Sequence, residues 1–128
     1  MSGIYVHVPF CRTACHYCDF HFSTSLSRVD TYVNALLKEV ELRSENPDWK
    51  SLEFQTLYFG GGTPSVLSPG SLKLITGAIS DSFRFKDSGQ NASFLEATIE
   101  VNPEDVTSES LQGWMDAGFN RLSIGVQS

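Results

Sequence analysis

Hydrophobic and polar residues alternate along parts of this chain and recur at wider spacing in other parts. Alternation predicts strands, because successive side chains of a strand point to opposite faces. Ile4, Val6 and Val8 alternate with other residues until Pro9, and residues 122–127 alternate in the same way. Between these two segments lie a β-prone run at residues 56–59 and an apolar segment at residues 97–101. The sequence therefore predicts four strands, over residues 4–9, 56–59, 97–101 and 122–127.

Three other segments carry hydrophobic residues at the spacing of one helix face. The first covers residues 27–42 with Ser27 as its expected N-cap, the second begins at Ser68, and the third is capped by Thr107 and ends near Gly118. The side chains expected to face the core are Val29, Val33, Leu36, Leu37, Val40, Leu72, Ile75, Ile79, Leu111, Trp114 and Met115.

Strands and helices alternate in this prediction, which indicates the α/β class with parallel strands and right-handed crossovers. The 128 residues suffice for one hydrophobic core, so we expect a single domain over residues 1–128. The polar segment 87–93 is expected to be a surface loop. Because the last strand would have no helix to cover it, we also expect this domain to be truncated at its carboxyl end.

Strand alternation also predicts a polar face opposite the helices. In parallel α/β barrels, functional residues gather at the carboxyl ends of the strands, where Glu100, Gln127 and the loops starting at Phe10 and Gly60 are expected to lie. The residues expected on this face are Tyr5, His7, Thr98, Glu100, Asn102, Ser123, Gly125 and Gln127.

Composition narrows the classes of function. The net charge is −6 and the nine Lys and Arg residues are dispersed, which argues against a nucleic-acid surface. The amino terminus lacks the pattern of a secretory signal, and no stretch approaches the roughly 18 apolar residues of a membrane span. We therefore expect a soluble, cytoplasmic protein without a membrane span.

Three cysteines, Cys11, Cys15 and Cys18, lie in one short loop directly after the first strand. Their odd number and close spacing fit metal ligands better than a disulfide framework. Three thiolates on a [4Fe–4S] cluster leave one iron open, which an amine and a carboxylate could chelate, as the methionyl end of S-adenosylmethionine (SAM) offers. A Cys₃His zinc site that uses His16 or His7 is the alternative.

The run from Gly60 to Pro64 reads Gly-Gly-Gly-Thr-Pro and follows the second predicted strand. Such a run can be a plain turn. It can also let backbone groups approach a ligand closely, because glycine has no Cβ.

Five motifs, taken in order, resemble the radical SAM family that contains oxygen-independent coproporphyrinogen III oxidase and the haem chaperone HemW. They are Tyr-Val-His-Val-Pro-Phe at 5–10, Cys-x₃-Cys-x₂-Cys at 11–18, Gly-Gly-Gly-Thr-Pro at 60–64, Glu-Val-Asn-Pro at 100–103 and Arg-Leu-Ser-Ile-Gly-Val-Gln-Ser at 121–128. The resemblance covers essentially the whole chain. It implies the amino-terminal part, about four βα units, of a partial (β/α)₆ barrel.

The resemblance also implies cofactors and the residues that hold them, but no catalytic residue. Cys11, Cys15 and Cys18 correspond to the ligands of a [4Fe–4S] cluster. The residues that correspond to positions beside the cluster or SAM are Tyr5, Tyr17, Gly61, Gly62, Thr63, Glu100 and Gln127.

For function, the resemblance implies a HemW-like haem chaperone that binds a cluster, SAM and haem or a porphyrin, with an acceptor protein that the sequence does not identify. The alternative within the family is an oxygen-independent coproporphyrinogen III oxidase. Those oxidases carry a further cysteine two residues after the last ligand, where this chain has Phe20, the form typical of HemW proteins. A zinc-stabilised α/β binding module is a third hypothesis, from a different class of function.

Overall fold

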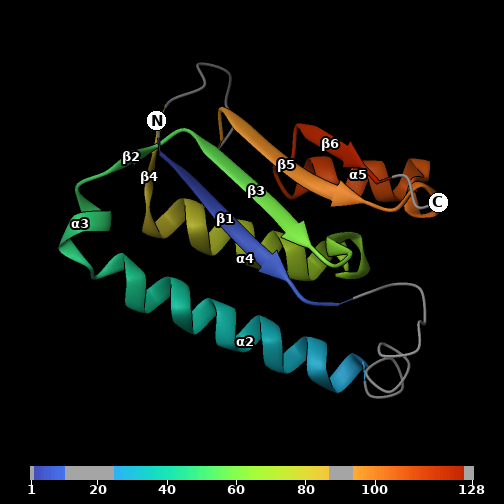
Figure 1. The fold of residues 1–128 in the computed structure, drawn as a ribbon, viewed down its shortest axis with the longest axis horizontal. Coiled ribbons are helices and arrows are strands. Elements are labelled where there is room, and N and C mark those ends of the chain that lie inside the picture. Colours follow the sequence, from blue (N-terminus) through green and yellow to red (C-terminus); the bar gives the residue numbers. More distant parts are fainter. Residues whose placement is uncertain (1, 11–24, 87–93, 126–128) are drawn as a thin grey trace.

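The computed structural model describes residues 2–10, 25–86 and 94–125. Its main sheet contains four parallel strands, and their order across the sheet is their order along the chain (Figure 1). These strands are β1 (Gly3–Val8), β3 (Thr56–Gly61), β5 (Glu96–Val101) and β6 (Arg121–Ile124). The sequence prediction of an α/β fold with four parallel strands is confirmed.

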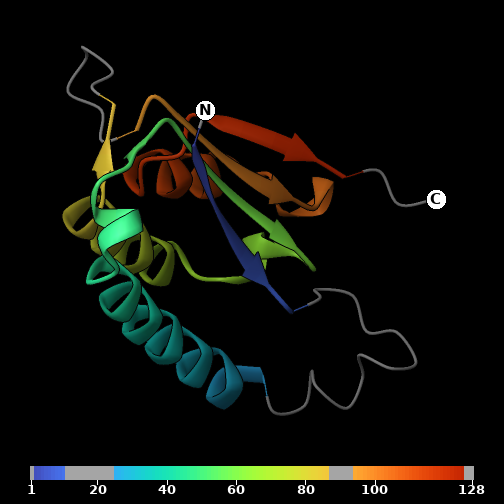
Figure 2. The ribbon, with the colours of Figure 1, turned by 60° about the vertical axis from the view of Figure 1, so that its left-hand side comes forward.

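Helices connect successive strands and lie on one side of the sheet (Figures 1 and 2). They are α2 (Ser25–Ser44), α4 (Pro69–Ser82) and α5 (Ser108–Asp116). The short 3₁₀ helices η1 (Pro64–Val66) and η2 (Pro103–Asp105) follow β3 and β5. This one-sided arrangement leaves the other face of the sheet open.

The hydrophobic core fills the space between the sheet and the helices. Strands β1, β3 and β5 contribute alternating residues, as their pattern predicts, whereas Leu122 and Ile124 of β6 are exposed. Each fully buried aliphatic or aromatic side chain stabilises the fold by roughly 1.5–3 kcal/mol. The buried side chains of this layer include Val6, Val8, Leu57, Phe59, Ile99, Val101, Val33, Val40, Leu72, Ile75, Ile79 and Trp114.

Local signals explain most of the helix ends. The Ser68 side chain accepts a hydrogen bond from the Ser71 amide at the start of α4. Thr107 and Ser110 form a reciprocal capping box at the start of α5. Gly118 follows α5 with a φ of 105°, a left-handed conformation that favours glycine. These predictions are confirmed.

Two details of the helix prediction are wrong. Helix α2 begins at Ser25, so Ser27 lies within its first turn and is not the N-cap. Leu26 lies three residues before Val29, so the helical spacing of apolar residues already extends into that first turn. Met115 is 65% exposed, because the inner face of α5 is set by Trp114 and the nearby Ala117, and Met115 points away from both.

A second, two-stranded parallel sheet was not predicted. It pairs β2 (Glu53–Phe54) with β4 (Arg84–Phe85), and the one-turn helix α3 (Pro47–Lys50) precedes it. Its signal in the sequence is weak, because two-residue strands show no period. Aromatic rings pack around this sheet and close the amino-terminal end of the core; they belong to Trp49, Phe54, Phe83, Phe85 and Phe94.

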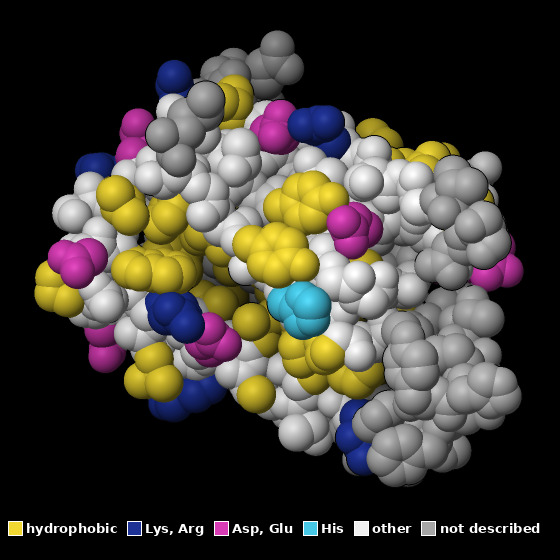
Figure 3. Space-filling model, in the orientation of Figure 1, with side chains coloured by type: hydrophobic (Ala, Val, Ile, Leu, Met, Phe, Trp, Pro, Cys, Tyr) yellow, Lys and Arg dark blue, Asp and Glu magenta, His cyan; other side chains and the backbone are white. Residues whose placement is uncertain are grey.

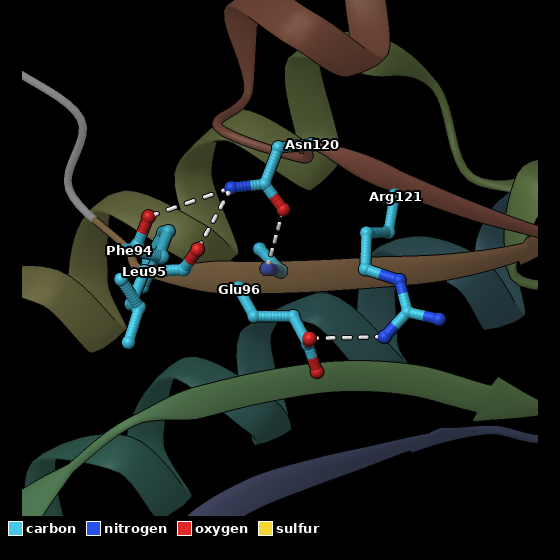
Figure 4. Close-up of polar contacts among 6 residues, drawn as sticks. Phe94, Leu95, Glu96, Asn120 and Arg121 are labelled. Carbon is cyan, nitrogen blue, oxygen red and sulfur yellow. Dashed lines mark hydrogen bonds and ion pairs between the residues drawn. The ribbon is translucent and has the colours of Figure 1, made fainter. Parts of the chain in front are cut away.

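Asn120 fixes the start of β6 against the start of β5 (Figure 4). Its side chain accepts a hydrogen bond from the Ala97 amide and donates to the carbonyl oxygens of Phe94 and Leu95. Beside it, Arg121 forms an ion pair with Glu96 at 2.9 Å. These contacts hold the amino ends of the strands together, at the end of the sheet opposite the loops discussed next. In the part of the chain that the structure describes, no helix is long and apolar enough to cross a lipid bilayer.

Candidate functional site

Aromatic side chains form a row on the open face of the sheet. Tyr5 of β1 pairs in register with Tyr58 of β3, and their rings stack with centroids 6.0 Å apart. The Tyr5 hydroxyl lies 3.2 Å from Nδ1 of His7, two residues further along the same strand. Figure 3, which looks onto this face, shows a histidine among hydrophobic side chains near its centre. Strand alternation places all three on one face.

Glu100 of β5 is held at both carboxylate oxygens. Oε2 accepts a hydrogen bond of 2.7 Å from the Tyr58 hydroxyl, and Oε1 accepts one of 3.1 Å from the Gly61 amide. The carboxylate therefore connects β5 to the loop that follows β3. Hydrogen bonds to a charged acceptor are stronger than those between neutral groups, so this arrangement fixes the side chain in one orientation.

The hydrogen bond to Glu100 also acts on Tyr58. It raises the pKa of the Tyr58 phenol, which must lose this bond when it ionises, and a hydrogen bond with Ser123 acts in the opposite direction. Tyr58 therefore stays a neutral donor at physiological pH. It was not among the predicted site residues, because the run 56–59 was interpreted only as a short strand. Its position two residues before Gly60 is the sequence signal that could have pointed to it.

The three glycines at the end of β3 face different neighbours. A Cβ on Gly60 would lie 2.9 Å from the Tyr58 ring and 3.0 Å from Oε1 of Glu100. Gly61 has a φ of 113°, and a Cβ there would lie 2.8 Å from the His7 ring. This conformation is strained for any other residue. The Gly62 backbone passes against Phe10.

A cleft of about 240 Å³ opens at the carboxyl ends of β3, β5 and β6. Backbone from the glycine loop forms one wall, and Glu100 and Ser123 contribute polar side chains. The residues that line it are Gly61, Gly62, Thr63, Glu100, Val101, Asn102, Ser123 and Gly125. Four predicted site residues, Gly61, Gly62, Thr63 and Glu100, are thus brought together, in the place where parallel α/β barrels carry their sites.

The loops around the cleft are tied to each other. The Ser65 hydroxyl of η1 donates a hydrogen bond of 2.7 Å to Oδ2 of Asp105 in η2. The Asn102 amide donates to the Ser65 oxygen. Because η1 follows the glycine loop and η2 follows Glu100, these bonds keep the two walls of the cleft at a fixed distance.

A second cavity, of about 230 Å³, lies between β1 and α2. Figure 3 shows a hollow lined by hydrophobic side chains to one side of the aromatic row. Its lining is mostly apolar, including Ile4, Val40, Trp49 and Phe83. Its charged lining residues, Glu39 and Arg43, form an ion pair with each other at 2.6 Å, so the cleft is the better site for a small charged ligand.

Five of the predicted site residues lie outside the described part of the chain: Cys11, Cys15, Cys18, Tyr17 and Gln127. Among the residues that the structure describes, no three His, Cys, Asp or Glu side chains form a group that could hold a metal ion. Tyr5 lies on the open face but does not line the cleft itself. The described chain reaches Phe10, whose carbonyl oxygen accepts a hydrogen bond from the amide of Thr63, a residue that lines the cleft.

Comparison with known proteins adds independent findings. A model of the radical SAM superfamily matches residues 5–128. The chain is 37% identical to the heme chaperone HemW of Bacillus subtilis (strain 168), an alignment that covers 100% of this chain and 32% of that protein. It is 38% identical to the oxygen-independent coproporphyrinogen III oxidase of Helicobacter pylori (strain J99), with 98% of this chain and 26% of that protein covered.

A solved structure shares the fold. Coproporphyrinogen III oxidase (HemN) from Escherichia coli, described as a radical SAM enzyme, superposes with a TM-score of 0.74 at 32% identity. The superposition covers 98% of this chain and 27% of the oxidase. The chain thus spans about a third or less of the length of the relatives it matches.

Proposed function

The chain belongs to the radical SAM superfamily, and from this premise we propose that it binds a [4Fe–4S] cluster through Cys11, Cys15 and Cys18 and SAM in the cleft beside Glu100. The family implies both cofactors. The observation that carries the proposal is the cleft: its lining includes an oriented carboxylate, and the glycine loop that forms one wall is hydrogen-bonded to Phe10, the residue that precedes Cys11.

The residues of the cleft fit the charged end of SAM. Glu100 offers a carboxylate for an ammonium group, and its orientation is fixed before the ligand arrives. Thr63 and Ser123 offer hydroxyl groups for a carboxylate. The glycine loop lets backbone groups approach the ligand without side chains in the way.

The donor set also fits the cluster. Thiolates are the usual ligands of iron–sulfur clusters, and three of them leave one iron for the amine and carboxylate of SAM. Together the two cofactors supply one-electron chemistry when bound. The chain itself holds and orients SAM: Glu100 and the glycine loop position its amino-acid end. Tyr5 and Tyr58 lie beside it on the open face of the sheet.

For the substrate, we propose haem or a porphyrin, because the relatives named above act on these compounds. Phe20, in place of a further cysteine, favours HemW-like transfer of haem to an acceptor protein. Oxidation of coproporphyrinogen III is the second candidate, supported by the similarity to two oxidases over nearly the whole chain.

Metal analysis after anaerobic reconstitution tests the cluster. The wild type should hold about four iron and four sulfide per chain, and Cys15→Ser should lose both, because a hydroxyl is a poor ligand for these irons. His16→Gln serves as the control: it should keep the iron but would lose the zinc of a Cys₃His site that uses His16. Zinc without iron in the wild type would refute the proposal in favour of the zinc module.

Two assays separate the substrate proposals. Haem titration, monitored by absorbance, should show that the protein binds haem. Anaerobic incubation of the protein with coproporphyrinogen III, SAM and a reductant should give no decarboxylated product. Decarboxylation by the wild type, lost in Cys15→Ser, would replace haem transfer by oxidase activity.

A further inference from the structure

The segment that leads into the cysteine loop is bound on one side by the glycine loop. After the register of β1 with β3 ends at Val8 and Gly61, the Gly62 amide donates a hydrogen bond of 2.8 Å to the Val8 carbonyl oxygen. The Thr63 amide donates to the Phe10 carbonyl oxygen. Two successive amides of the glycine loop thus hold two carbonyls of residues 8–10.

Gly62 is needed for this approach. A Cβ at this position would overlap the Phe10 carbonyl oxygen and lie 2.9 Å from its carbon. Both are backbone atoms, which cannot rotate away as the end of a flexible side chain can. Any larger residue at 62 must therefore push Phe10 away or break the two hydrogen bonds.

Helix α2 holds the same segment from the other side. The Tyr32 hydroxyl donates a hydrogen bond of 2.6 Å to the His7 carbonyl oxygen. The Tyr32 ring also meets the Phe10 ring edge to face, with centroids 5.4 Å apart. Burial, followed by the charge of Glu39, raises the pKa of Tyr32 to about 12, so its hydroxyl remains a donor at working pH.

We propose that Gly62 and Tyr32 are positioning residues for the iron–sulfur cluster: they clamp residues 7–10 and so fix where the chain enters the cysteine loop. Phe10 immediately precedes Cys11 in the sequence, and adjacent Cα atoms are about 3.8 Å apart, so a shift of Phe10 carries Cys11 with it. Gly62 then serves the cluster in addition to any contact with SAM. The inference rests on the proposed function, in which Cys11 binds the cluster.

The test measures cluster assembly without SAM, so that a role in SAM binding alone has no effect. Gly62→Ala, Tyr32→Phe and Tyr32→Leu are made in the full natural chain and reconstituted anaerobically with iron and sulfide. The matched control is Gly77→Ala, because Gly77 lies within α4 and a Cβ there meets nothing within 4 Å. The readouts are iron per chain, the electron paramagnetic resonance (EPR) spectrum of the reduced cluster, the rate of iron loss to a chelator, and the thermal unfolding midpoint.

Gly62→Ala should hold less than half of the wild-type iron. Tyr32→Phe should assemble the cluster but lose iron to the chelator about 3- to 10-fold faster, at an unfolding midpoint close to that of the wild type. Tyr32→Leu, which also loses the ring contact, should be more labile than Tyr32→Phe and show an altered EPR spectrum. Gly77→Ala should match the wild type in iron content, spectrum and lability.

Two failures are distinguishable. A wild type without iron refutes the proposed function. A loaded wild type whose Gly62→Ala and Tyr32→Phe variants keep its iron content, spectrum and chelator rate overturns the clamp. If Gly62→Ala does not fold, the comparison of Tyr32→Phe with wild type decides alone: equal lability overturns the inference, and faster loss supports it.

Discussion

At the scale of residues, adjacent glycines of the same loop make room for different groups. Gly60 leaves space for the carboxylate of Glu100, Gly61 adopts a left-handed φ of 113°, and Gly62 leaves space for the Phe10 backbone. A glycine run after a strand therefore has separate requirements at each position, and substitutions at the three sites should affect different parts of the site.

Tyr58→Phe tests whether the orientation of Glu100 matters for SAM. The variant loses the hydroxyl that donates to Oε2 and keeps the ring that stacks on Tyr5. A hydrogen bond at this partly exposed carboxylate is worth about 1 kcal/mol, so the Kd for SAM should rise roughly fivefold. Anaerobic calorimetry on the cluster-loaded protein measures it.

The comparison for Tyr58→Phe is Glu100→Gln, which removes the charge itself and should weaken SAM binding more. If Tyr58→Phe keeps the wild-type Kd for SAM while Glu100→Gln raises it, Glu100 contacts SAM without needing the hydrogen bond from Tyr58. If neither variant changes the Kd, Glu100 is not a SAM contact.

The raised pKa of Tyr32 predicts a pH dependence of stability. Burial in the folded protein raises the pKa of Tyr32 to about 12, from 10.0 for an unperturbed tyrosine. Between these values the unfolded chain loses the proton and the folded chain keeps it, so the stabilising contribution is complete below pH 10 and is lost as pH rises through 12. The free energy of unfolding should therefore fall less steeply above pH 10 in Tyr32→Phe than in the wild type.

Urea unfolding at several pH values between 9 and 12 gives these slopes. Absorbance of the ionised phenol near 295 nm gives a direct check, because Tyr32→Phe should remove a late phase of the tyrosine titration. A variant that removes a phase near pH 10 would contradict the assigned burial of this phenol.

At the scale of elements, the packing of α4 against α5 gives the same substitution opposite effects at two glycines. Gly77→Ala in α4 should stabilise the protein by about 0.5–1 kcal/mol, because its Cβ meets nothing within 4 Å and alanine is the better helix former. Gly113→Ala in α5 should destabilise it by about 1–3 kcal/mol, because its Cβ would lie 2.8 Å from Cγ of Pro69.

Urea denaturation of the two variants measures both effects with each as the control of the other. If both Gly77→Ala and Gly113→Ala stabilise the protein, α5 can shift away from Pro69 at no cost in free energy. If both destabilise it, the gain in helix propensity at position 77 is outweighed by an unfavourable contact that the structure does not show.

The elements with a strong period or a β-prone run of several residues, such as β3, were predictable from sequence, and the two-residue strands were not. Alternation found β1, β5 and β6, and caps found the starts of α4 and α5, since these signals are local. Strands β2 and β4 pair with each other, have two residues each, and are stabilised by the aromatic rings that pack around them. The exposure of the apolar Met115 side chain depends on which face of α5 packs against the sheet, and the sequence of α5 alone does not specify that face.

The same distinction holds for the candidate site. Gly61, Gly62, Thr63 and Glu100 were found from motifs, and the structure places them around one cleft. Tyr58 was missed because its role arises from a hydrogen bond across 42 residues of sequence. Tyr32 was missed for a similar reason: within α2 it looks like one more residue of an amphipathic helix, and its partner is the backbone of β1.

At the scale of the whole molecule, the strand order and the one-sided helices give a curved sheet with a covered face and an open face. Glu100, Tyr5 and Tyr58 lie on the open face, while the aliphatic residues of the strands lie on the other. In the described part of the chain, β6 pairs on one side only, with β5, and its Leu122 and Ile124 are 36% and 52% exposed.

Residues 1–128 produced alone should therefore self-associate through β6, because an edge strand with exposed apolar side chains is a template for pairing. Ile124→Lys should shift the population toward monomer, as lysine on an edge strand opposes pairing. Sedimentation velocity measures the shift. Leu74→Lys is the control, because Leu74 is 61% exposed on the helix α4 and not on a strand, and should not change the association. Equal sedimentation of wild type and Ile124→Lys would exclude β6 as the contact.

The clamp on residues 7–10 joins parts of the chain that a ribosome makes at different times. About 45 residues separate Cys18 from Thr63, so at 5–20 residues per second the cysteines are synthesised roughly 2–9 s before the amides that bind Phe10. During that interval the thiols have no glycine loop beside them. We expect iron to enter after β3 has emerged and paired with β1, and nascent chains stalled before Gly62 leaves the ribosome to take up none.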